Sequence, residues 1–401
     1  MIGSELPKGW DIQPLKEVVT STKGKKPKQL SELPFDNSIP YIDIKALEKD
    51  LIEQYADVES SKSFSPNDIA VVWDGARCGW VSKSKEGAIG STICALTPKN
   101  NIESNYLYYF LLEKYPIVNS KGRGVGIPHV DPTFFWDMEV PIPFPKEQKQ
   151  IAEKLDKFFD QIETIKEASN KIPELLKNFR QQVLNYAVTG KLIESTPEPR
   201  MLGELIDELK YGTSKKADYV IEGFPVLRIP NINNGEIDSS DLKYVPLDDK
   251  EYNQLSLQEG DILVIRSNGS LSIVGQCAIV RKECENWVYA GYLIRIRCTH
   301  ELLPEYLNYI FQSYQVRKQI VEKSHSMSGV NNFSADKIKQ LEIAWYPVEV
   351  QKQIVEKLNS IFGKLNEIEK QYNTLSEKLE KLPQTLLCKA FKGELIYERF
   401  T

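Results

Sequence analysis

The segment from Gln148 to Leu155 reads Gln-Lys-Gln-Ile-Ala-Glu-Lys-Leu, and 203 residues later Gln351 to Leu358 read Gln-Lys-Gln-Ile-Val-Glu-Lys-Leu. The match continues without a gap to residues 193 and 396, with 18 identities among 46 aligned positions. It extends weakly toward the N-terminus, where Gly126 is opposite Gly329. Because this period is too long for a solenoid unit, the 401-residue chain is predicted to be a tandem of two related halves.

The repeated segments carry apolar residues at alternating spacings of four and three, which is typical of a coiled coil. Pro173 and Pro383 should break or kink each helix, so we expect a helix of about 25–35 residues followed by one of about 10–15 in each half. The simplest arrangement packs the two stripes on each other, and the alternative docks each stripe on its own globular domain. The stripe residues are Ile151, Leu155, Phe158, Ile162, Ile165, Ile172 and Leu176 in the first half, and Ile354, Leu358, Ile361, Leu365, Ile368, Leu375 and Leu379 in the second.

The regions upstream of the helices share only loose parallels and are predicted to be mixed α and β. Residues 194–200 resemble a linker that closes the first half. The divergence has two explanations: neutral drift of loops, or surfaces that read different targets on one scaffold. Strand-like segments are 40–44, 68–73, 91–96, 224–229, 261–265 and 292–297, and helix-like segments are 107–114 and 304–322.

Composition excludes several classes of protein. With 41% hydrophobic and 27% charged residues the chain can bury cores, which argues against disorder. The formal net charge of −5 excludes a global basic field for nucleic acid, so any DNA contact must be local. No apolar run reaches the roughly 18 residues of a membrane span, and the N-terminus lacks a signal-peptide core. We therefore expect a cytoplasmic protein without a disulfide framework.

Searches for catalytic motifs are negative. The sequence has no phosphate-binding loop, no dinucleotide fingerprint and no Gly-x-Ser-x-Gly element. Asp131-Pro-Thr-Phe134 lacks the second proline expected of a base-amine methyltransferase motif. The three histidines and six cysteines show no metal-ligand spacing. We predict neither catalysis nor a metal site; the open alternatives are a coiled-coil adaptor for other proteins and an enzyme with an unfamiliar site.

Basic and polar clusters lie in turn-like stretches, where lysine and arginine can neutralise phosphates and polar side chains can read base edges. The alternative interpretation is that each cluster is simply a solvated loop without a binding role. Arg295 and Arg297 share one face of a predicted strand, and we expect that face to be solvated. The candidate DNA-binding residues are Lys25, Lys26, Arg77, Arg123 and His129 in the first half, and Lys215, Arg228, Arg266, Asn268, Ser270 and His325 in the second.

The order of these features resembles the specificity subunit of Type I restriction–modification enzymes. The matching elements are Leu6-Pro-Lys-Gly-Trp10, a variable region ending in Val140-Pro-Ile-Pro143, the Gln-Lys-Gln-Ile helix, and then the whole order again. One departure is Trp345-Tyr-Pro-Val in the second copy. The resemblance implies an α+β fold with two α/β target-recognition domains (1–145 and 196–345) and two long antiparallel coiled-coil regions (146–195 and 346–401).

The resemblance also implies a function. Each recognition domain would read one half of a split, asymmetric site in double-stranded DNA, and the paired helices would set the unread gap. Two methyltransferase subunits, carrying S-adenosylmethionine, would dock around the helices. Restriction–translocase subunits would bring ATP and magnesium, and this chain would itself bind no cofactor. A helix of about 30 residues spans roughly 45 Å, close to the roughly 34–36 Å of one DNA turn.

Overall fold

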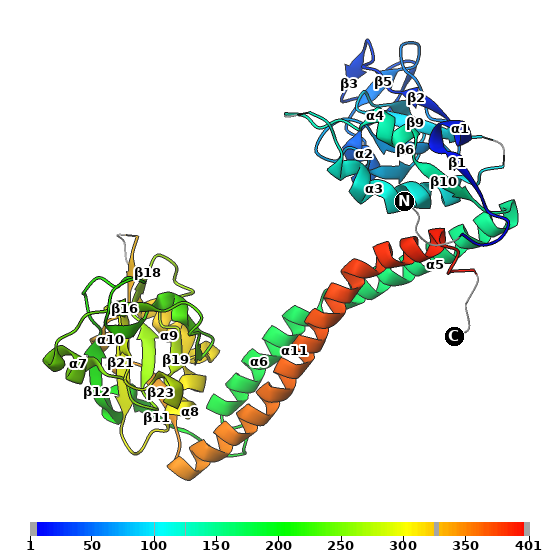
Figure 1. The fold of residues 1–401 in the computed structure, drawn as a ribbon. Coiled ribbons are helices and arrows are strands. Elements are labelled where there is room, and N and C mark those ends of the chain that lie inside the picture. The colour runs from blue at the N-terminus through cyan, green and yellow to red at the C-terminus, as the bar shows by residue number, and fades with distance from the viewer. Residues whose placement is uncertain (1–5, 100, 125, 325–328, 397–401) are drawn as a thin grey trace. The chain divides into compact units, whose positions relative to one another are not determined.

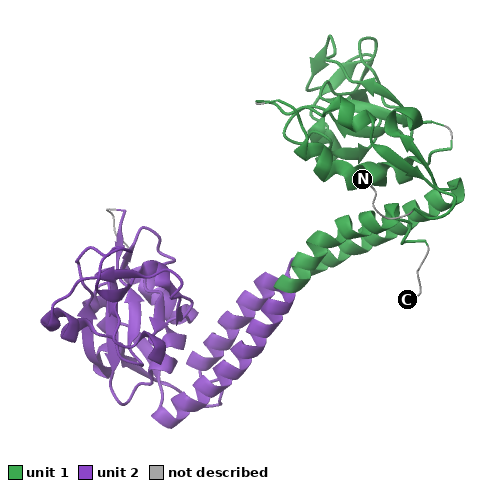
Figure 2. Ribbon diagram, in the orientation of Figure 1, with its two compact units in different colours: residues 1–169, 373–401 green, residues 170–372 purple. Residues whose placement is uncertain are grey.

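A computed structural model describes residues 6–99, 101–124, 126–324 and 329–396 (Figure 1). The chain divides into two compact units, green and purple in Figure 2: residues 1–169 with 373–401, and residues 170–372. Each unit holds one globular domain and part of the long helix α11 (Val348–Phe391). α11 gives its first 25 residues to unit 2 and the remainder to unit 1.

Unit 1 is built on two four-stranded sheets, in the orders β2-β9-β6-β7 and β3-β5-β4-β8, with a two-stranded β1-β10 pair. All four residues of β6 are buried, as expected for a β-branched strand between two neighbours. The elements are β1 (Asp11–Pro14), α1 (Leu15–Val18), β2 (Val19–Lys23), β3 (Leu30–Ser31), β4 (Ser38–Ile42), α2 (Ile44–Lys49), β5 (Tyr55–Asp57), β6 (Ile69–Val72), β7 (Val81–Lys83), β8 (Ala88–Ile89), β9 (Ile93–Pro98), α3 (Ser104–Ser120), α4 (Pro132–Trp136), β10 (Glu139–Ile142) and α5 (Pro145–Ser169).

Unit 2 contains a four-stranded sheet in the order β12-β21-β17-β19, a three-stranded sheet β16-β13-β20, and the pairs β14-β15, β18-β22 and β11-β23. Its elements before α11 are α6 (Ile172–Val188), β11 (Glu198–Met201), β12 (Ile206–Tyr211), β13 (Phe224–Leu227), β14 (Ile232–Asn233), β15 (Glu236–Ile237), β16 (Lys243–Val245), α7 (Asp249–Leu255), β17 (Ile262–Ile265), β18 (Ser267–Asn268), β19 (Cys277–Ile279), β20 (Val288–Tyr289), β21 (Leu293–Cys298), α8 (Pro304–Ile310), α9 (Tyr314–Ser324), β22 (Asn331–Asn332), α10 (Ala335–Lys339) and β23 (Glu342–Trp345), with short 3₁₀ turns at Leu202–Leu205, Ile229–Asn231 and Lys282–Cys284.

The main sheet has the same topology in both units, because β12, β21, β17 and β19 stand in the order of β2, β9, β6 and β7. The register agrees as well: Val71 and Lys23 both pair with Cys94, and Val264 and Tyr211 both pair with Ile294. The predicted α+β tandem repeat is therefore confirmed. Each predicted strand contains an observed one, but the helix predicted at 304–322 is two helices, α8 and α9, separated at residues 311–313.

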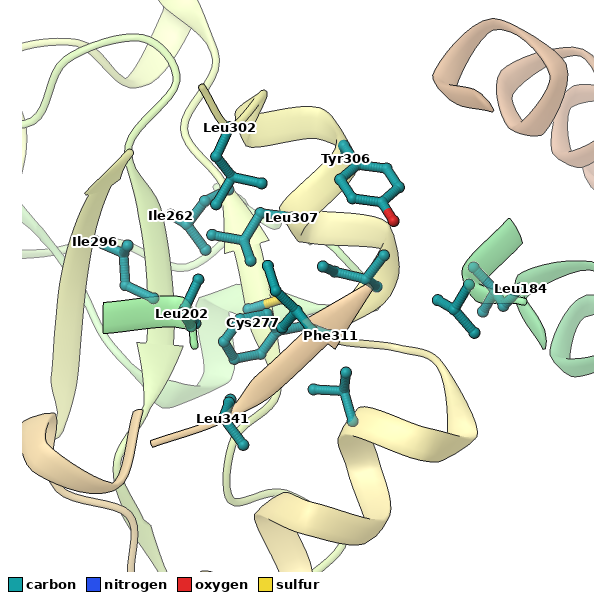
Figure 3. Packing of buried hydrophobic residues seen from close by; sticks show 14 of the residues in the cluster. Leu184, Leu202, Ile262, Cys277, Ile296, Leu302, Tyr306, Leu307, Phe311 and Leu341 are labelled. Atoms are coloured by element: carbon teal, nitrogen blue, oxygen red, sulfur yellow. The ribbon is translucent and has the colours of Figure 1, made fainter. Parts of the chain in front are cut away.

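Each unit has a core that joins its sheet to its long helices. Figure 3 shows part of the unit 2 core, where Leu184 of α6 faces a cluster from the sheet and α8. The unit 1 core likewise joins α3 and the sheet to both α5 and the last turns of α11. The labelled members in Figure 3 are Leu184, Leu202, Ile262, Cys277, Ile296, Leu302, Tyr306, Leu307, Phe311 and Leu341.

One buried glutamine fastens each long helix to its domain. In unit 1 the amide of Gln148 accepts from the backbone N–H of Glu103 (2.8 Å) and donates to two carbonyls. In unit 2 Gln351 accepts from Leu303 N (2.8 Å) and donates to the carbonyls of Glu301 and Tyr346. The first glutamine of the repeated motif is thus a structural clamp, which explains its recurrence.

The break expected at Pro173 occurs, since α5 ends at Ser169 and α6 begins with proline in its first turn, where the missing N–H costs nothing. The break expected at Pro383 is wrong, because α11 runs without interruption over 44 residues with that proline inside it. Leu379 and Leu387 on either side are buried, so packing holds the helix through the lost hydrogen bond.

The apolar stripes pack in two ways. Their ends dock on the domains and on α11: Ile151 and Leu155 lie in the unit 1 core with Phe391, and Ile354 and Leu358 in the unit 2 core. Both arrangements left open by the sequence therefore contribute. Ile162, Leu365 and Leu379 are also buried, and Ile172, Leu176 and Ile361 are half-buried. The expectation that the stripes bury each other throughout is wrong for four members, which stay 36–47% exposed: Phe158, Ile165, Ile368 and Leu375.

The segment predicted as a linker, 194–200, ends in a strand. β11 pairs antiparallel with β23, with Glu198 opposite Trp345, as β1 pairs with β10 in unit 1. A glycine at φ +80° follows the last long helix of each repeat: Gly190 lies between α6 and β11, and Gly393 follows α11. A Cβ at Gly190 would collide with the Ser195 carbonyl, and one at Gly393 with the ring of Pro7. In unit 1 the C-terminal helix therefore ends beside the start of the domain.

Candidate nucleic-acid interface

The C-terminal end of β6 in unit 1 continues into a short ribbon. Residues 73–75 pair with residues 128–130, through Val130 N to Trp73 O (3.0 Å) and Gly75 N to Pro128 O (2.8 Å). We call these two segments the first ribbon. His129 exchanges two further backbone hydrogen bonds with Arg123 (2.8 and 2.7 Å), so these two sequence-predicted residues are adjacent.

A carboxylate organises the side chains of the first ribbon. Asp74 accepts from His129 Nδ1 and from Lys23 Nζ, each at 2.7 Å. Burial alone would raise the pKa of Asp74, but the hydrogen bonds from Lys23 and His129 outweigh it and the net pKa lies below the ordinary value. An ionised carboxylate only accepts hydrogen bonds, so the proton is on Nδ1 and the ring is held in one orientation. The His129 side chain remains 52% exposed.

Arg123 is also paired with a carboxylate, since its guanidinium contacts Asp131 at 2.6 Å. Asp131 in turn caps α4 by accepting from the backbone N–H groups of Thr133 and Phe134. Burial alone would raise the pKa of Asp131. The hydrogen bonds from Phe134 N and Arg123 outweigh this effect, so the net pKa lies below the ordinary value. Arg123 therefore has a fixed direction near the ribbon.

The remaining candidates in unit 1 lie apart from the ribbon strands. Arg77 pairs with Glu48 at 2.6 Å, and this hydrogen bond is the main reason that the pKa of Glu48 is lowered. Lys25 and Lys26 follow β2, are exposed, and form no ion pair with any residue that the structure describes. Unlike Arg77 and Arg123, these two candidate cations could meet a phosphate without first leaving a carboxylate.

Unit 2 has a ribbon at the corresponding strand end. Ser267 of β18 is opposite Asn332 of β22, and Asn268 is opposite Asn331. Phe333 N donates to Arg266 O at 2.7 Å. We call residues 266–268 and 331–333 the second ribbon.

Three sequence-predicted residues of unit 2 meet at this ribbon. The Arg266 guanidinium lies over the ring of Tyr211, with Cζ 4.7 Å from the centroid. Asn268 Oδ1 accepts from Ser270 N (2.9 Å), and the Ser270 hydroxyl contacts that of Ser272 (2.8 Å). The second ribbon thus carries a cation, an amide and hydroxyls.

Two other candidates of unit 2 are paired elsewhere in the domain. Lys215 contacts Glu251 of α7 at 2.5 Å, and Arg228 contacts Asp241 at 2.9 Å. His325 lies outside the described residues. Among the residues that the structure does describe, no group of three or more His, Cys, Asp or Glu side chains is arranged to hold a metal ion, and no helix has the length and apolarity needed to cross a bilayer.

Comparison with known proteins decides the family. The family model described as Type I restriction modification DNA specificity domain matches twice, over residues 7–174 and 195–378. The chain belongs to this specificity family. The two matches cover both halves of the repeat.

Similar curated proteins span the specificity-family chain almost completely. The Type I restriction enzyme EcoKI specificity subunit of Escherichia coli (strain K12) is 33% identical, over 98% of this chain and 91% of the relative. The StySPI specificity subunit of Salmonella potsdam is 29% identical, over 98% and 90%. Since the first relative exceeds 30% identity over nearly its whole length, both halves of the chain have counterparts in it.

Two solved structures share the fold of the specificity-family chain. One has a TM-score of 0.72 at 18% identity, covering 97% of this chain and 99% of the other. It is described as the structural basis of complex assembly and conformational transition of the type I R-M system. The HsdS subunit from Thermoanaerobacter tengcongensis has a TM-score of 0.66 at 17% identity, covering 98% and 99%.

Sequence reasoning misplaced one pair of charges in this specificity-family chain. Arg295 and Arg297 do share a strand face, but the face is not solvated. Arg295 is 1% exposed and donates to Glu208 (2.6 Å), while Arg297 donates to the buried Asp261 (2.8 Å). The acidic partners come from β12 and from the turn before β17, which are distant in sequence, so strand alternation alone could not reveal them.

Sequence reasoning did not single out Asp74 or Asn332, which the structure places on the two ribbons, and it noted Lys23 only as part of a basic cluster. Asp74 is a lone acid in a basic neighbourhood, and a search for cations passes over it. The only available signal was the repeat itself: His129 and Asn332 are 203 residues apart, the offset of the helical motif.

Proposed function

We propose that the chain is the non-catalytic DNA-specificity subunit of a Type I restriction–modification complex, in which each unit reads one half of a bipartite DNA site. The observation that carries the proposal is that one sheet topology occurs twice, with different polar side chains beyond the equivalent strand ends. Two readers on one scaffold are what a split, asymmetric target requires. The specificity-family match over both halves supports it.

We propose that the DNA contacts come from the loops around the two ribbons, with help from partners. Four candidate cations, Arg77, Arg123, Lys215 and Arg228, are paired with carboxylates, and the chain is acidic overall. Much of the phosphate neutralisation then falls to other subunits. The proposed contact residues are Lys25, Lys26, Arg77, Arg123 and His129 in unit 1, and Lys215, Arg228, Arg266, Asn268, Ser270 and His325 in unit 2.

We propose that the helices set the length of the unread gap. An uninterrupted helix of 44 residues is about 66 Å long, and α11 belongs to both units. A continuous helix resists bending, so it is suited to fix a spacing.

We propose that two methyltransferase subunits dock on the helices. In each unit, large apolar side chains of α11 and of α5 or α6 stay exposed, and we call this set the exposed line. Exposed apolar groups of this kind often mark contacts with other proteins. S-adenosylmethionine would belong to these subunits, and ATP and magnesium to restriction subunits that join them. The exposed line comprises Phe158, Ile165, Leu375 and Leu382 in unit 1, and Leu175, Phe179 and Ile368 in unit 2.

The test is to produce the chain with a Type I methyltransferase subunit from the same genome in a host without other adenine methylation, and to sequence the methylome. A bipartite motif that disappears when the chain is omitted supports the proposal. Replacing residues 1–145 by the domain of another family member should change one half-site only. A complex that binds no DNA in a gel shift would favour the adaptor alternative, and methylation or cleavage by the chain alone would favour an enzyme.

A further inference from the structure

The two ribbons are equivalent in backbone hydrogen bonding. Val130 N to Trp73 O in unit 1 corresponds to Phe333 N to Arg266 O in unit 2. On the other side, Trp73 N donates to Thr92 O (2.8 Å), and Arg266 N donates to Tyr292 O (2.9 Å). Each ribbon is followed by a short helix, capped by Asp131 in one unit and Ser334 in the other.

This register places individual side chains in correspondence. Asp74 is directly opposite His129, and Ser267 is directly opposite Asn332. Residues directly opposite in an antiparallel pair have their side chains on the same face. The pairs Asp74–His129 and Ser267–Asn332 therefore occupy the same two positions of one scaffold.

A cation–aromatic contact lies at the base of both ribbons, with its partners exchanged. In unit 1 Lys23 lies 5.5 Å from the centroid of Trp73, and in unit 2 Arg266 lies 4.7 Å from that of Tyr211. Lys23 and Tyr211 occupy equivalent strand positions, opposite Cys94 and Ile294. In unit 1 the cation lies on the edge strand and the aromatic ring on the ribbon, whereas in unit 2 the ring lies on the edge strand and the cation on the ribbon. The cation–aromatic contact is retained, so it stabilises the base of the ribbon in both units.

The side chains above this brace differ in hydrogen-bonding chemistry. His129 is oriented by Asp74 and keeps Nε2 as its remaining polar atom. Asn332 is exposed, and its amide makes no hydrogen bond to any residue within the described part of the chain. An asparagine amide offers the donor and acceptor that adenine takes in the major groove, and a histidine offers a single polar atom. The braced scaffold thus presents two different readouts.

We propose that the two ribbons are the base-reading elements, with His129 positioned by Asp74 reading one half-site and Asn332 beside Ser267 reading the other. A two-stranded β-ribbon fits the width of the major groove, and its outward side chains meet the base edges. The assignment rests on the proposed function, because it names the residues through which each unit discriminates bases. Asp74 acts as a positioning residue for His129.

The experiment uses the complex of chain and methyltransferase subunit, and compares methylomes of wild type, His129→Gln, Asp74→Asn and Asn332→Ala. His129→Gln and Asp74→Asn should relax or change one base pair in one half-site, by about tenfold or more in preference. Asn332→Ala should do so in the other half-site only. His300→Gln and Asn178→Ala, which replace exposed residues away from the ribbons, should leave both half-sites intact.

The outcomes separate this inference from the proposed function. If the wild-type complex methylates no bipartite motif, the proposed function fails. If the wild-type motif is present but all three ribbon variants keep it unchanged, the ribbon assignment fails alone. A folded variant that no longer methylates is resolved by gel shift: loss of preference with retained binding to random DNA supports the assignment, and loss of both binding modes contradicts it.

Discussion

Arg295 is the largest side chain that the described part of the fold buries completely. Its guanidinium donates to Glu208 and to the carbonyl of Ser256 (2.8 Å), and lies near Asp261. A buried charge is tolerated only when its partners are present, because desolvation costs several kcal/mol for each ion. This cluster ties the edge strand β12 to the centre of the unit 2 sheet.

Arg295→Met should lower the free energy of unfolding by about 3 kcal/mol, since it removes one of the cations that compensate the buried carboxylate of Asp261. Urea denaturation followed by circular dichroism measures the effect. Arg281→Met is the matched control, because Arg281 is 44% exposed and pairs with Glu236 at the surface. The control should cost less than about 1 kcal/mol; equal losses would mean that the buried cluster has no special role.

The repeated motif contains its own comparison between a buried and an exposed glutamine. Gln351→Leu should destabilise unit 2 by roughly 2–3 kcal/mol, because it leaves Leu303 N and two carbonyls without partners. Gln353→Leu, two residues later and exposed, should be nearly neutral. Thermal melts of the two variants decide the point, and a neutral Gln351→Leu would refute the clamp.

At the scale of the helices, replacing each of the two prolines by alanine is expected to affect stability differently. Pro383→Ala should stabilise the chain by about 1–3 kcal/mol, because alanine restores the hydrogen bond to the carbonyl four residues earlier. Pro173→Ala should change little, since a first-turn residue has no such bond to gain. Denaturant midpoints compare them, and a destabilised Pro383→Ala would show that the proline shapes α11.

Elements whose pattern is local were predictable from the sequence. The strand at residues 69–72 follows from its β-branched run, and the helices follow from a spacing that recurs over many turns. The break at Pro383 was mispredicted because local proline chemistry competes with packing contributed by α5 and α3, which no window of sequence contains. Exposed stripe members such as Ile165 were mispredicted because periodicity locates an apolar face without saying what covers it.

The two ribbons could not be predicted from any local sequence pattern. β18 and β22 have two residues each, and their strands are about 60 positions apart, so neither propensity nor alternation marks them. Candidate residues chosen for charge included His129 and Arg266 but not Asp74 or Asn332, whose roles depend on what stands opposite. The 203-residue offset, carried back from the helical motif toward Gly126 and Gly329, aligns His129 with Asn332, but it does not align Asp74 with Ser267.

At the scale of the whole chain, the helices make a quantitative prediction. Deleting one heptad from α5 after Ile162, together with one from α11 after Leu375, removes about 10 Å of helix. The unread gap should shorten by about three base pairs, at roughly 3.4 Å each, while both half-sites stay the same. Methylome sequencing reads out gap and half-sites together.

The paired deletion is needed because α5 and α11 pack on each other within unit 1. Deleting from one helix alone should instead reduce the melting temperature. A paired deletion that folds and keeps the original gap would contradict the ruler.

The self-paired cations have a kinetic consequence for a protein that must find its site in a genome. Each of four candidate cations already forms an ion pair with a carboxylate, so a phosphate can pair with one of them only by displacing that carboxylate. The four are Arg77, Arg123, Lys215 and Arg228. Under the proposed contacts, random DNA offers no base contacts to offset the exchange, so we expect these four cations to release few counterions there. Such ion-paired cations would favour brief binding to non-target DNA, so that contacts with the base edges determine where the protein stays bound.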